Sequence, residues 1–183
     1  MSRYALFSLF FLMGIICISG CVATSSVETK PSDDDLYLQS LEDFLTTSGS
    51  LSSQQGNAQF SKDDMVWAEY KIRSASYYNR VSPLKVSSQF ELSKTSFLLS
   101  VNSMEGLADF MLKHPREEQL RYAGMSAENL PGSIRQDYIE VQQNNQNFAL
   151  FLIKTFDSNV CSAAEGKFSN ITSFCKTVQE HST

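Results

Sequence analysis

The sequence has few histidines, no common hydrolase or nucleotide-binding motif and no excess of positive charge, and each of these shortages counts against a class of function. Its two histidines, His114 and His181, have no partner at a metal-ligand spacing. It contains no Gly-x-Ser-x-Gly element and no phosphate-binding glycine loop, which are the signatures of many hydrolases and nucleotide-binding proteins. The net charge is −5, whereas nucleic-acid binding demands a basic surface. We therefore expect no metal, no cofactor and no nucleic-acid partner.

The adjacent carboxylates Glu117 and Glu118 invite comparison with the acid and base of a glycosidase. Neighbouring residues on a helix point about 100° apart, so the two groups would face different directions. A solvated, charged helix face is the better interpretation. No catalytic signature remains, and we expect a protein that is not an enzyme.

The sequence also lacks an apolar run long enough to span a bilayer, which needs about 20 residues. Its N-terminal run, Tyr4 to Ile18, has fifteen residues, is interrupted by Ser8 and Gly14, and follows the single charge of Arg3. A short charged region before a short apolar core is typical of a secretory signal. This run ends in Ile18-Ser19-Gly20-Cys21.

These four residues resemble the lipobox of bacterial lipoproteins. The resemblance implies that residues 1–20 are a signal peptide, cleaved before Cys21, and that Cys21 carries a diacylglyceryl group and an acyl chain such as palmitate on its new amino terminus. Two or more acyl chains give a stable membrane anchor without a spanning helix. Val22, in place of an aspartate, implies sorting to the outer membrane of a diderm bacterium, with the domain facing the periplasm.

The mature chain divides into a spacer and one domain. Residues 21–35 are polar and contain Pro31, which predicts a flexible tether. The acidic run Asp33 to Asp35 belongs to this tether or forms the negative first turn of a helix. The remaining residues, 36–183, are enough for a single hydrophobic core.

Apolar periodicity predicts an all-α domain, either a bundle or stacked helix hairpins, with five to seven helices. We expect a helix that Gly49 ends, a loop over 48–59, and a helix whose apolar stripe is Met65, Ala68, Ile72 and Ala75.

Ser82 and Pro83 predict the start of another helix, carrying Val86, Phe90, Phe97 and Val101, although residues 86–101 also alternate in places like a strand. A further short helix from Ser103 would end at His114, before Pro115. The last helices would begin at Ser133 and after Gly166.

The helix from Ser133 has the strongest apolar pattern. Residues 148–153 are apolar on every side, which predicts burial all round and places the centre of the core here. Asn145 lies within the stripe, where a polar residue usually sets register. Alternatively, this helix faces another protein, with Tyr138, Gln142 and Asn145 at the rim of the contact.

A second group of candidate contact residues is aromatic: Trp67, Tyr70, Tyr77 and Tyr78. Tyrosine and tryptophan are favoured at protein interfaces, and these four cover more than one face of a helix. Packing in the core is the default interpretation for most of them.

Cys161 and Cys175 are the cysteines of the domain. In an exported chain such a pair commonly forms a disulfide. On one straight helix they would be roughly 21 Å apart, far beyond bonding range, so a bond requires the chain to turn between them. Gly166 is the expected turn, and unpaired thiols are the alternative.

Together these features favour a non-enzymatic outer-membrane lipoprotein that binds an envelope protein, as an assembly factor, a pilotin-like guide or an accessory of a sensor. The chain is similar to secretion pilotins in general plan only, and no binding residue follows from that similarity. An envelope enzyme acting on peptidoglycan and a carrier of lipid or a small ligand are the alternatives.

Overall fold

The computed structural model describes residues 30–56, 60–114, 118, 121 and 125–180. Cys21, the expected signal peptide and most of the expected tether lie outside these residues, as do Glu117 and His181. The regular structure of the described residues is entirely helical, which confirms the all-α prediction. It comprises α2 (Asp33–Gly56), α3 (Phe60–Val81), α4 (Glu91–Lys113), the 3-10 turn η2 (Ala127–Asn129), α6 (Gly132–Thr155), α7 (Ser158–Ala164) and α8 (Ser169–Glu180).

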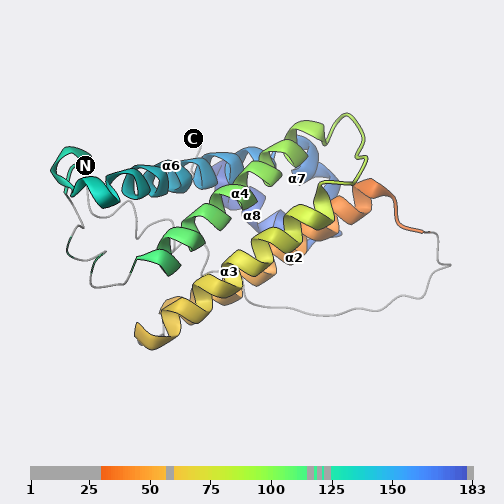
Figure 1. Cartoon of the computed structure of the whole chain (residues 1–183). Helices are drawn as coiled ribbons and strands as arrows, with labels where there is room; N and C mark the ends of the chain where they lie inside the picture. Colours follow the sequence, from red (N-terminus) through yellow and green to blue (C-terminus); the bar gives the residue numbers. More distant parts are fainter. Residues whose placement is uncertain (1–29, 57–59, 115–117, 119–120, 122–124, 181–183) are drawn as a thin grey trace.

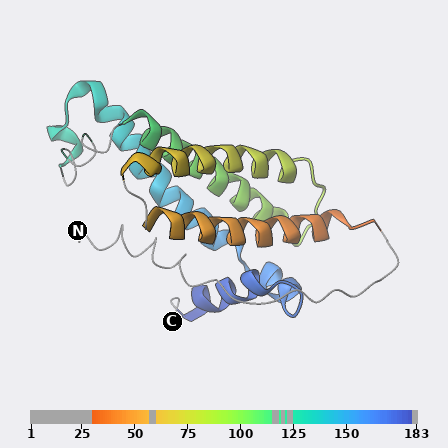
Figure 2. The ribbon, with the colours of Figure 1, turned by 90° about the horizontal axis from the view of Figure 1, so that it is seen from below.

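Long helices pack side by side in chain order (Figures 1 and 2). Helix α3 returns along α2, α4 lies between α3 and α6, and α8 packs against α2 and α7. In the described part of the chain, no helix is long and apolar enough to cross a membrane.

Helix α2 begins inside the expected tether, at Asp33, and the acidic run fixes this start. Ser32 accepts a hydrogen bond from the amide of Asp35 (3.1 Å), and the Asp35 carboxylate accepts one from the amide of Ser32 (3.3 Å), a reciprocal cap. The hydrogen bond from the Ser32 hydroxyl lowers the pKa of Asp35. Asp33 and Asp34 accept hydrogen bonds from the backbone amides of Lys85 and Ser87 (both 2.7 Å).

These two bonds explain why the expected helix start at Ser82 and Pro83 is wrong. Residues 82–90 form turns and irregular backbone, and α4 begins only at Glu91. In a helix that begins at Pro83, the amide of Ser87 would donate to the carbonyl of Pro83, but here it donates to Asp34 of α2. Val86 and Phe90 are buried, as their apolar character predicts, but they reach the core from a loop.

The helix end expected at Gly49 is wrong, and so is the loop expected over 48–59 as far as Gly56, because α2 continues to that residue. The last part of the expected loop, 57–59, lies outside the described residues. A glycine inside a helix costs about 1 kcal/mol. Packing of α2 along α3 offsets this cost: Ser48 is buried, and the Tyr77 hydroxyl donates a hydrogen bond to Thr47 (3.2 Å). Local composition was therefore a poor guide to this boundary.

Of residues 86–101, left open between helix and strand, 91–101 are helical whereas 86–90 belong to the loop before α4. Helix α4 runs without a break through Ser103 to the expected end before His114. The separate helix expected from Ser103 is therefore wrong. Much of the buried side of α4 is serine, which allows close approach of a neighbouring helix: the buried residues include Ser93, Ser96, Ser100 and Ser103.

Phe97 lies at the centre of an aromatic cluster that joins α2, α3 and α4. Its ring is fully buried and lies 5.2 Å from Phe44, 6.3 Å from Tyr77 and 6.4 Å from Tyr37, each edge to face. Such pairs contribute about 0.5–1.5 kcal/mol beyond the area that they bury. This cluster, and not α6, is the centre of the core.

A buried polar chain links the same region to α6. The Ser93 hydroxyl donates to the carbonyl of Thr155 (2.5 Å), so the Tyr37 hydroxyl donates to Ser93 (2.6 Å). Burial raises the pKa of Tyr37 far above its ordinary value, which keeps the phenol protonated as a donor. The polar groups of three helices are thereby satisfied inside the core.

Burial of α6 on every side is wrong. Of its 24 residues, the buried ones are Phe148, Leu152 and Thr155, whereas Leu150 and Ile153 are 48% and 51% exposed. The helix packs on α4 with one face, and its opposite face is open in the described structure.

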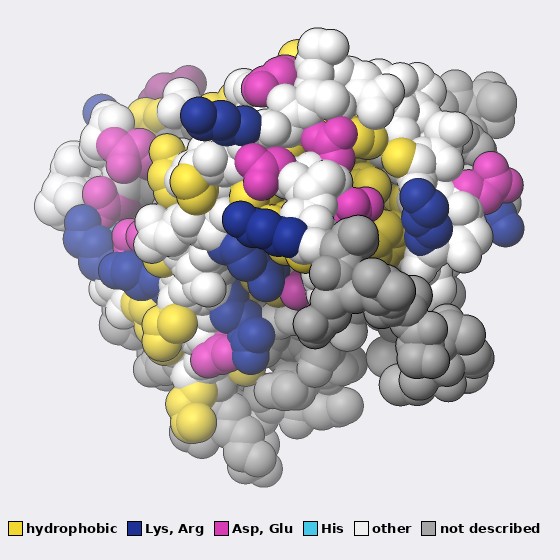
Figure 3. Space-filling model, turned by 90° about the vertical axis from the view of Figure 1, so that its right-hand side faces the viewer, with side chains coloured by type: hydrophobic (Ala, Val, Ile, Leu, Met, Phe, Trp, Pro, Cys, Tyr) yellow, Lys and Arg dark blue, Asp and Glu magenta, His cyan; other side chains and the backbone are white. Residues whose placement is uncertain are grey.

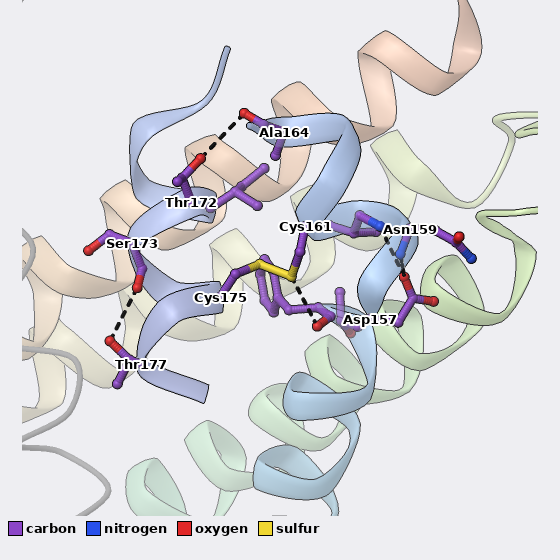
Figure 4. The surroundings of a disulfide bond; sticks show 12 residues. Asp157, Asn159, Cys161, Ala164, Thr172, Ser173, Cys175 and Thr177 are labelled. Atoms are coloured by element: carbon purple, nitrogen blue, oxygen red, sulfur yellow. Dashed lines mark hydrogen bonds between the residues drawn. A yellow bond between two sulfur atoms is a disulfide. The ribbon is translucent and has the colours of Figure 1, made fainter. Parts of the chain in front are cut away.

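The last two helices are joined by a disulfide between Cys161 and Cys175, with the Cα atoms 5.9 Å apart (Figure 4). The chain turns between them at Gly166, whose φ of 73° is favoured by glycine. The disulfide and the turn at Gly166 confirm the prediction. Helix α7, as a helix separate from α6, was not predicted.

Carboxylates cap both of these short helices. Asp157 accepts hydrogen bonds from the amides of Asn159 and Val160 (both 3.0 Å) at the start of α7. Glu42, on α2, accepts from the amides of Asn170 and Ile171 (both 3.0 Å) at the start of α8. The second cap ties the C-terminal unit to the first described helix.

Candidate protein-binding surfaces

Helix α3 has two apolar faces, and the core uses the one that the sequence pattern did not single out. The buried face repeats at intervals of three and four residues along Trp67, Tyr70, Ser74, Tyr77 and Val81, and Val66 is buried beside it. The aromatic residues are the larger, so their burial removes more apolar surface from water than the alternative stripe would.

The proposed aromatic contact surface is therefore wrong for three of its four members. Trp67, Tyr70 and Tyr77 are each less than a tenth exposed, and burial raises the pKa of Tyr70 to about 12. Tyr78 is 37% exposed and remains on the surface. Packing in the core, the default interpretation, describes the other three.

The expected core stripe of α3 faces outward instead. Met65 is 74% exposed and Ile72 is 64% exposed, with Ala68 and Ala75 half-buried along the same side. We call these four residues the outer stripe. Two large apolar side chains two turns apart on a solvent-exposed face have no function in the core.

Paired charges border the outer stripe. Lys71 forms an ion pair with Asp109 of α4 (2.6 Å), and Arg73 forms one with Glu69 of α3 (2.5 Å). Figure 3 shows one face of the molecule, on which Lys and Arg side chains lie among Asp and Glu and apolar side chains reach the surface. Exposed pairs add little stability, so their consequence here is a rim without strong net charge.

A polar groove of about 280 Å³ lies between α2 and α3. Across it, Arg80 pairs with Asp43 (3.0 Å) and lies over the ring of Tyr77 (4.9 Å). The groove offers both hydrogen-bond donors and acceptors, and it is lined by Asp43, Thr46, Thr47, Arg73, Ser76, Tyr77 and Arg80.

The residues expected at the rim of a contact on α6 lie along one side of the helix. Gln142 is exposed, Asn145 is half-buried, and Tyr138 packs edge to face against Phe110 (4.9 Å). The amide that meets another helix closely is Asn144, whose side chain contacts Gly106 of α4. The role of setting helix register, which was predicted for Asn145, therefore fits Asn144 better.

A cluster of ionisable groups that the sequence did not reveal joins the ends of α4 and α6. His114 is buried, and its two ring nitrogens lie 2.7 Å from Glu118 and 2.9 Å from Asp137. Hydrogen bonds from Lys113 and then His114 lower the pKa of Asp137. Helix spacing would have suggested the first pair, since His114 and Glu118 are four residues apart, but not the partner on α6.

This cluster holds helices together. Both ring nitrogens of His114 lie within hydrogen-bond distance of a carboxylate, Glu118 on one side and Asp137 on the other, so the buried imidazole links the end of α4 to α6. Among the residues that the structure describes, no group of three or more His, Cys, Asp or Glu side chains is arranged to hold a metal ion. The predicted alternative of a peptidoglycan enzyme gains no support from this cluster.

Comparison with known proteins adds no relative to this picture. No family model, no curated protein and no solved structure matches the chain. The candidate surfaces are therefore defined only by the residues of this chain. They are the outer stripe with its groove, and the open face of α6.

Proposed function

We propose that the protein is a lipid-anchored adaptor of the outer membrane, not an enzyme, and that it binds an envelope protein through the outer stripe of α3. The observation that supports this most directly is the exposure of Met65 and Ile72 on the face opposite the buried aromatics. Contiguous apolar positions that the core leaves in solvent are typical of interaction sites.

The surroundings of the outer stripe fit a protein partner. Interfaces have an apolar centre and a polar rim, and here the apolar residues lie between the Lys71–Asp109 and Arg73–Glu69 pairs. The stripe is narrow and follows one helix, so the matching partner is an amphipathic helix whose apolar positions recur every three to four residues. Polar side chains of that helix would enter the groove beside Arg73 and Arg80.

The anchor at Cys21 would set the range over which the adaptor acts. Eleven residues separate Cys21 from the first residue of α2, and fully extended they reach about 36 Å. Such a tether holds the domain near the membrane surface, which raises the effective concentration of the adaptor for membrane-bound partners.

Photo-crosslinking in cells tests the binding surface. A photoreactive amino acid at Met65 or Ile72 should yield one common adduct, identified by mass spectrometry. Leu92, which is 71% exposed but lies on α4, is the matched control and should yield none. Placing aspartate at Ile72 should abolish the Met65 adduct. Equal adducts from Leu92, or a Met65 adduct that survives Ile72→Asp, would contradict the proposed surface.

The anchor is tested separately by Cys21→Ser. This change should abolish acylation and either release the domain from membranes or leave an uncleaved precursor, read by metabolic labelling with a fatty acid and by fractionation. A variant that is still acylated and membrane-bound would remove the lipoprotein part of the proposal while leaving the crosslinking result intact.

A further inference from the structure

The open face of α6 is unusual in its lack of charge. Between Glu140 and Lys154, thirteen consecutive residues contain no Asp, Glu, Lys or Arg. The side of the helix away from α4 presents residues spaced four, three, four and three apart, which we call the outer seam: Ile139, Gln143, Gln146, Leu150 and Ile153. This is the spacing by which two helices pack along each other.

The outer seam lies opposite the contacts of α6 with α4. Asn144 meets Gly106, and Asp137 bonds to His114, so these positions mark the side that faces α4. At about 100° per residue, Leu150 lies about 120° around the helix from Asn144 and about 140° from Asp137. Leu150 and Ile153 are each about half exposed, and the seam is open to a partner.

One flank of the seam is complementary to itself. Glu140, Asn147 and Lys154 follow one another at intervals of two turns, with an acid at one end and a base at the other. If a second α6 lies antiparallel with Asn147 opposite Asn147, each Glu140 comes opposite a Lys154. Asparagine side chains both donate and accept, so the central pair also satisfies itself.

We propose that the outer seam is a self-association surface, on which α6 of a second copy lies antiparallel. In this arrangement Leu150 and Ile153 of each copy cover the uncharged Gln146 and Gln143 of the other. Opposite charges then meet at both ends of the contact.

A parallel pair fits less well. In a parallel pair, the flank with Glu140 and Lys154 would face the opposite flank of the second helix, which carries Arg135 and Ala149. Lys154 would then meet Ala149, and Glu140 would meet Arg135. The guanidinium group of Arg135 is already bonded to the carbonyls of Glu128 (3.1 Å) and Leu130 (3.0 Å). Charge complementarity therefore favours the antiparallel arrangement.

This contact goes beyond the proposed function and uses a different surface, since α4 separates α6 from α3. A dimer through α6 would leave both outer stripes accessible and would carry two anchors. Failure of one proposal leaves the other standing, because the variants that test them lie on different helices.

Disulfide trapping in membranes that contain the full-length protein tests the contact. Asn147→Cys should form a covalent dimer under mild oxidation, because the two-fold axis places this position opposite itself. The matched control is Asn102→Cys, an exposed asparagine on α4, and the unsubstituted chain controls for its own cysteines. Neither control should form a dimer, and an intact Cys161–Cys175 bond, read by mass spectrometry, reports correct folding.

Charge reversal tests the orientation. Added to Asn147→Cys, Glu140→Lys should lower the trapped fraction about tenfold, because two attractive contacts become repulsive. Adding Lys154→Glu as well should restore the trapped fraction. The proposal is overturned if Asn147→Cys traps no more dimer than Asn102→Cys, or if charge reversal leaves the trapped fraction unchanged.

Discussion

The aromatic region of α2, α3 and α4 and the C-terminal unit of α7 and α8 are stabilised in different ways. In the first, long helices bury large rings around Phe97. In the second, helices of seven and twelve residues are held by a disulfide and by carboxylate caps at Asp157 and Glu42.

The contrast follows from helix length. Isolated helices shorter than about 12–15 residues are marginal in water because nucleation is costly, so α7 and α8 need ties that long helices do not. A long helix gains stability from its buried face, where removing one side chain has a large local effect. Three changes test this contrast and a fourth tests the ionic contact between α4 and α6, in order from the largest expected effect to the smallest.

Phe97→Ala should be the most damaging change. It removes a fully buried ring that contacts Tyr37, Phe44 and Tyr77, and we expect a loss of about 3–5 kcal/mol in the free energy of unfolding, measured by urea denaturation. Leu92→Ala, at an exposed position of the same helix, should stay within about 0.5 kcal/mol. Similar losses for both would show that the core lies elsewhere.

Replacing Cys161 and Cys175 by serine should cost about 3 kcal/mol, because the bond closes a loop with a sequence separation of 14. Hydrogen exchange should rise most in α7 and α8, while α2 and α3 keep more of their protection. Reducing agent should reproduce the effect in the unsubstituted protein. Uniform loss of protection along the chain would argue against a separately tied C-terminal unit.

Glu42→Gln should cost about 1–2 kcal/mol, because a charged acceptor at the start of α8 becomes a neutral amide that is also a donor. Asp43→Asn is the matched control, since it breaks only the exposed pair with Arg80 and should cost less than about 1 kcal/mol. Thermal unfolding followed by circular dichroism distinguishes the two. Equal effects would mean that Glu42 is not the cap on which α8 depends.

Asp137 should show the smallest effect, as a pH dependence. Its pKa is lowered below the ordinary value of 3.8, so its contribution to stability is fully present above that value and is lost as pH falls through the folded-state pKa. Lys113→Met removes the first cause of the shift and should raise the pKa of Asp137, measured by carboxyl NMR titration. An unchanged titration would show that Lys113 does not hold this carboxylate.

The sequence predicted features that depend on neighbours along the chain. Helical class, the end of α4 before His114 and the turn at Gly166 follow from local spacing, and the bond between Cys161 and Cys175 follows from that spacing together with the expectation of export. The disulfide was predictable because a single turn suffices to bring the two sulfurs together.

What failed depended on contacts that are distant in sequence. Pro83 does not begin a helix because Asp33 and Asp34, some fifty residues earlier, take the nearby amides. On α3, two apolar patterns compete, and only the rings available from α2 and α4 decide which is buried. The contacts of Asp137 with His114 and of Asn144 with Gly106 could not be predicted for the same reason.

The cap that Glu42 provides for α8 has a consequence for the order of folding. A chain that folds as it is delivered, N-terminus first, presents the carboxylate early, but the helix that it caps lies 128 residues later. We expect α8 to dock last, since closing so long a loop is slow. The thiols of Cys161 and Cys175 are separated by one local turn, so their bond can close before α8 docks and can deliver α7 and α8 to Glu42 as one preassembled unit.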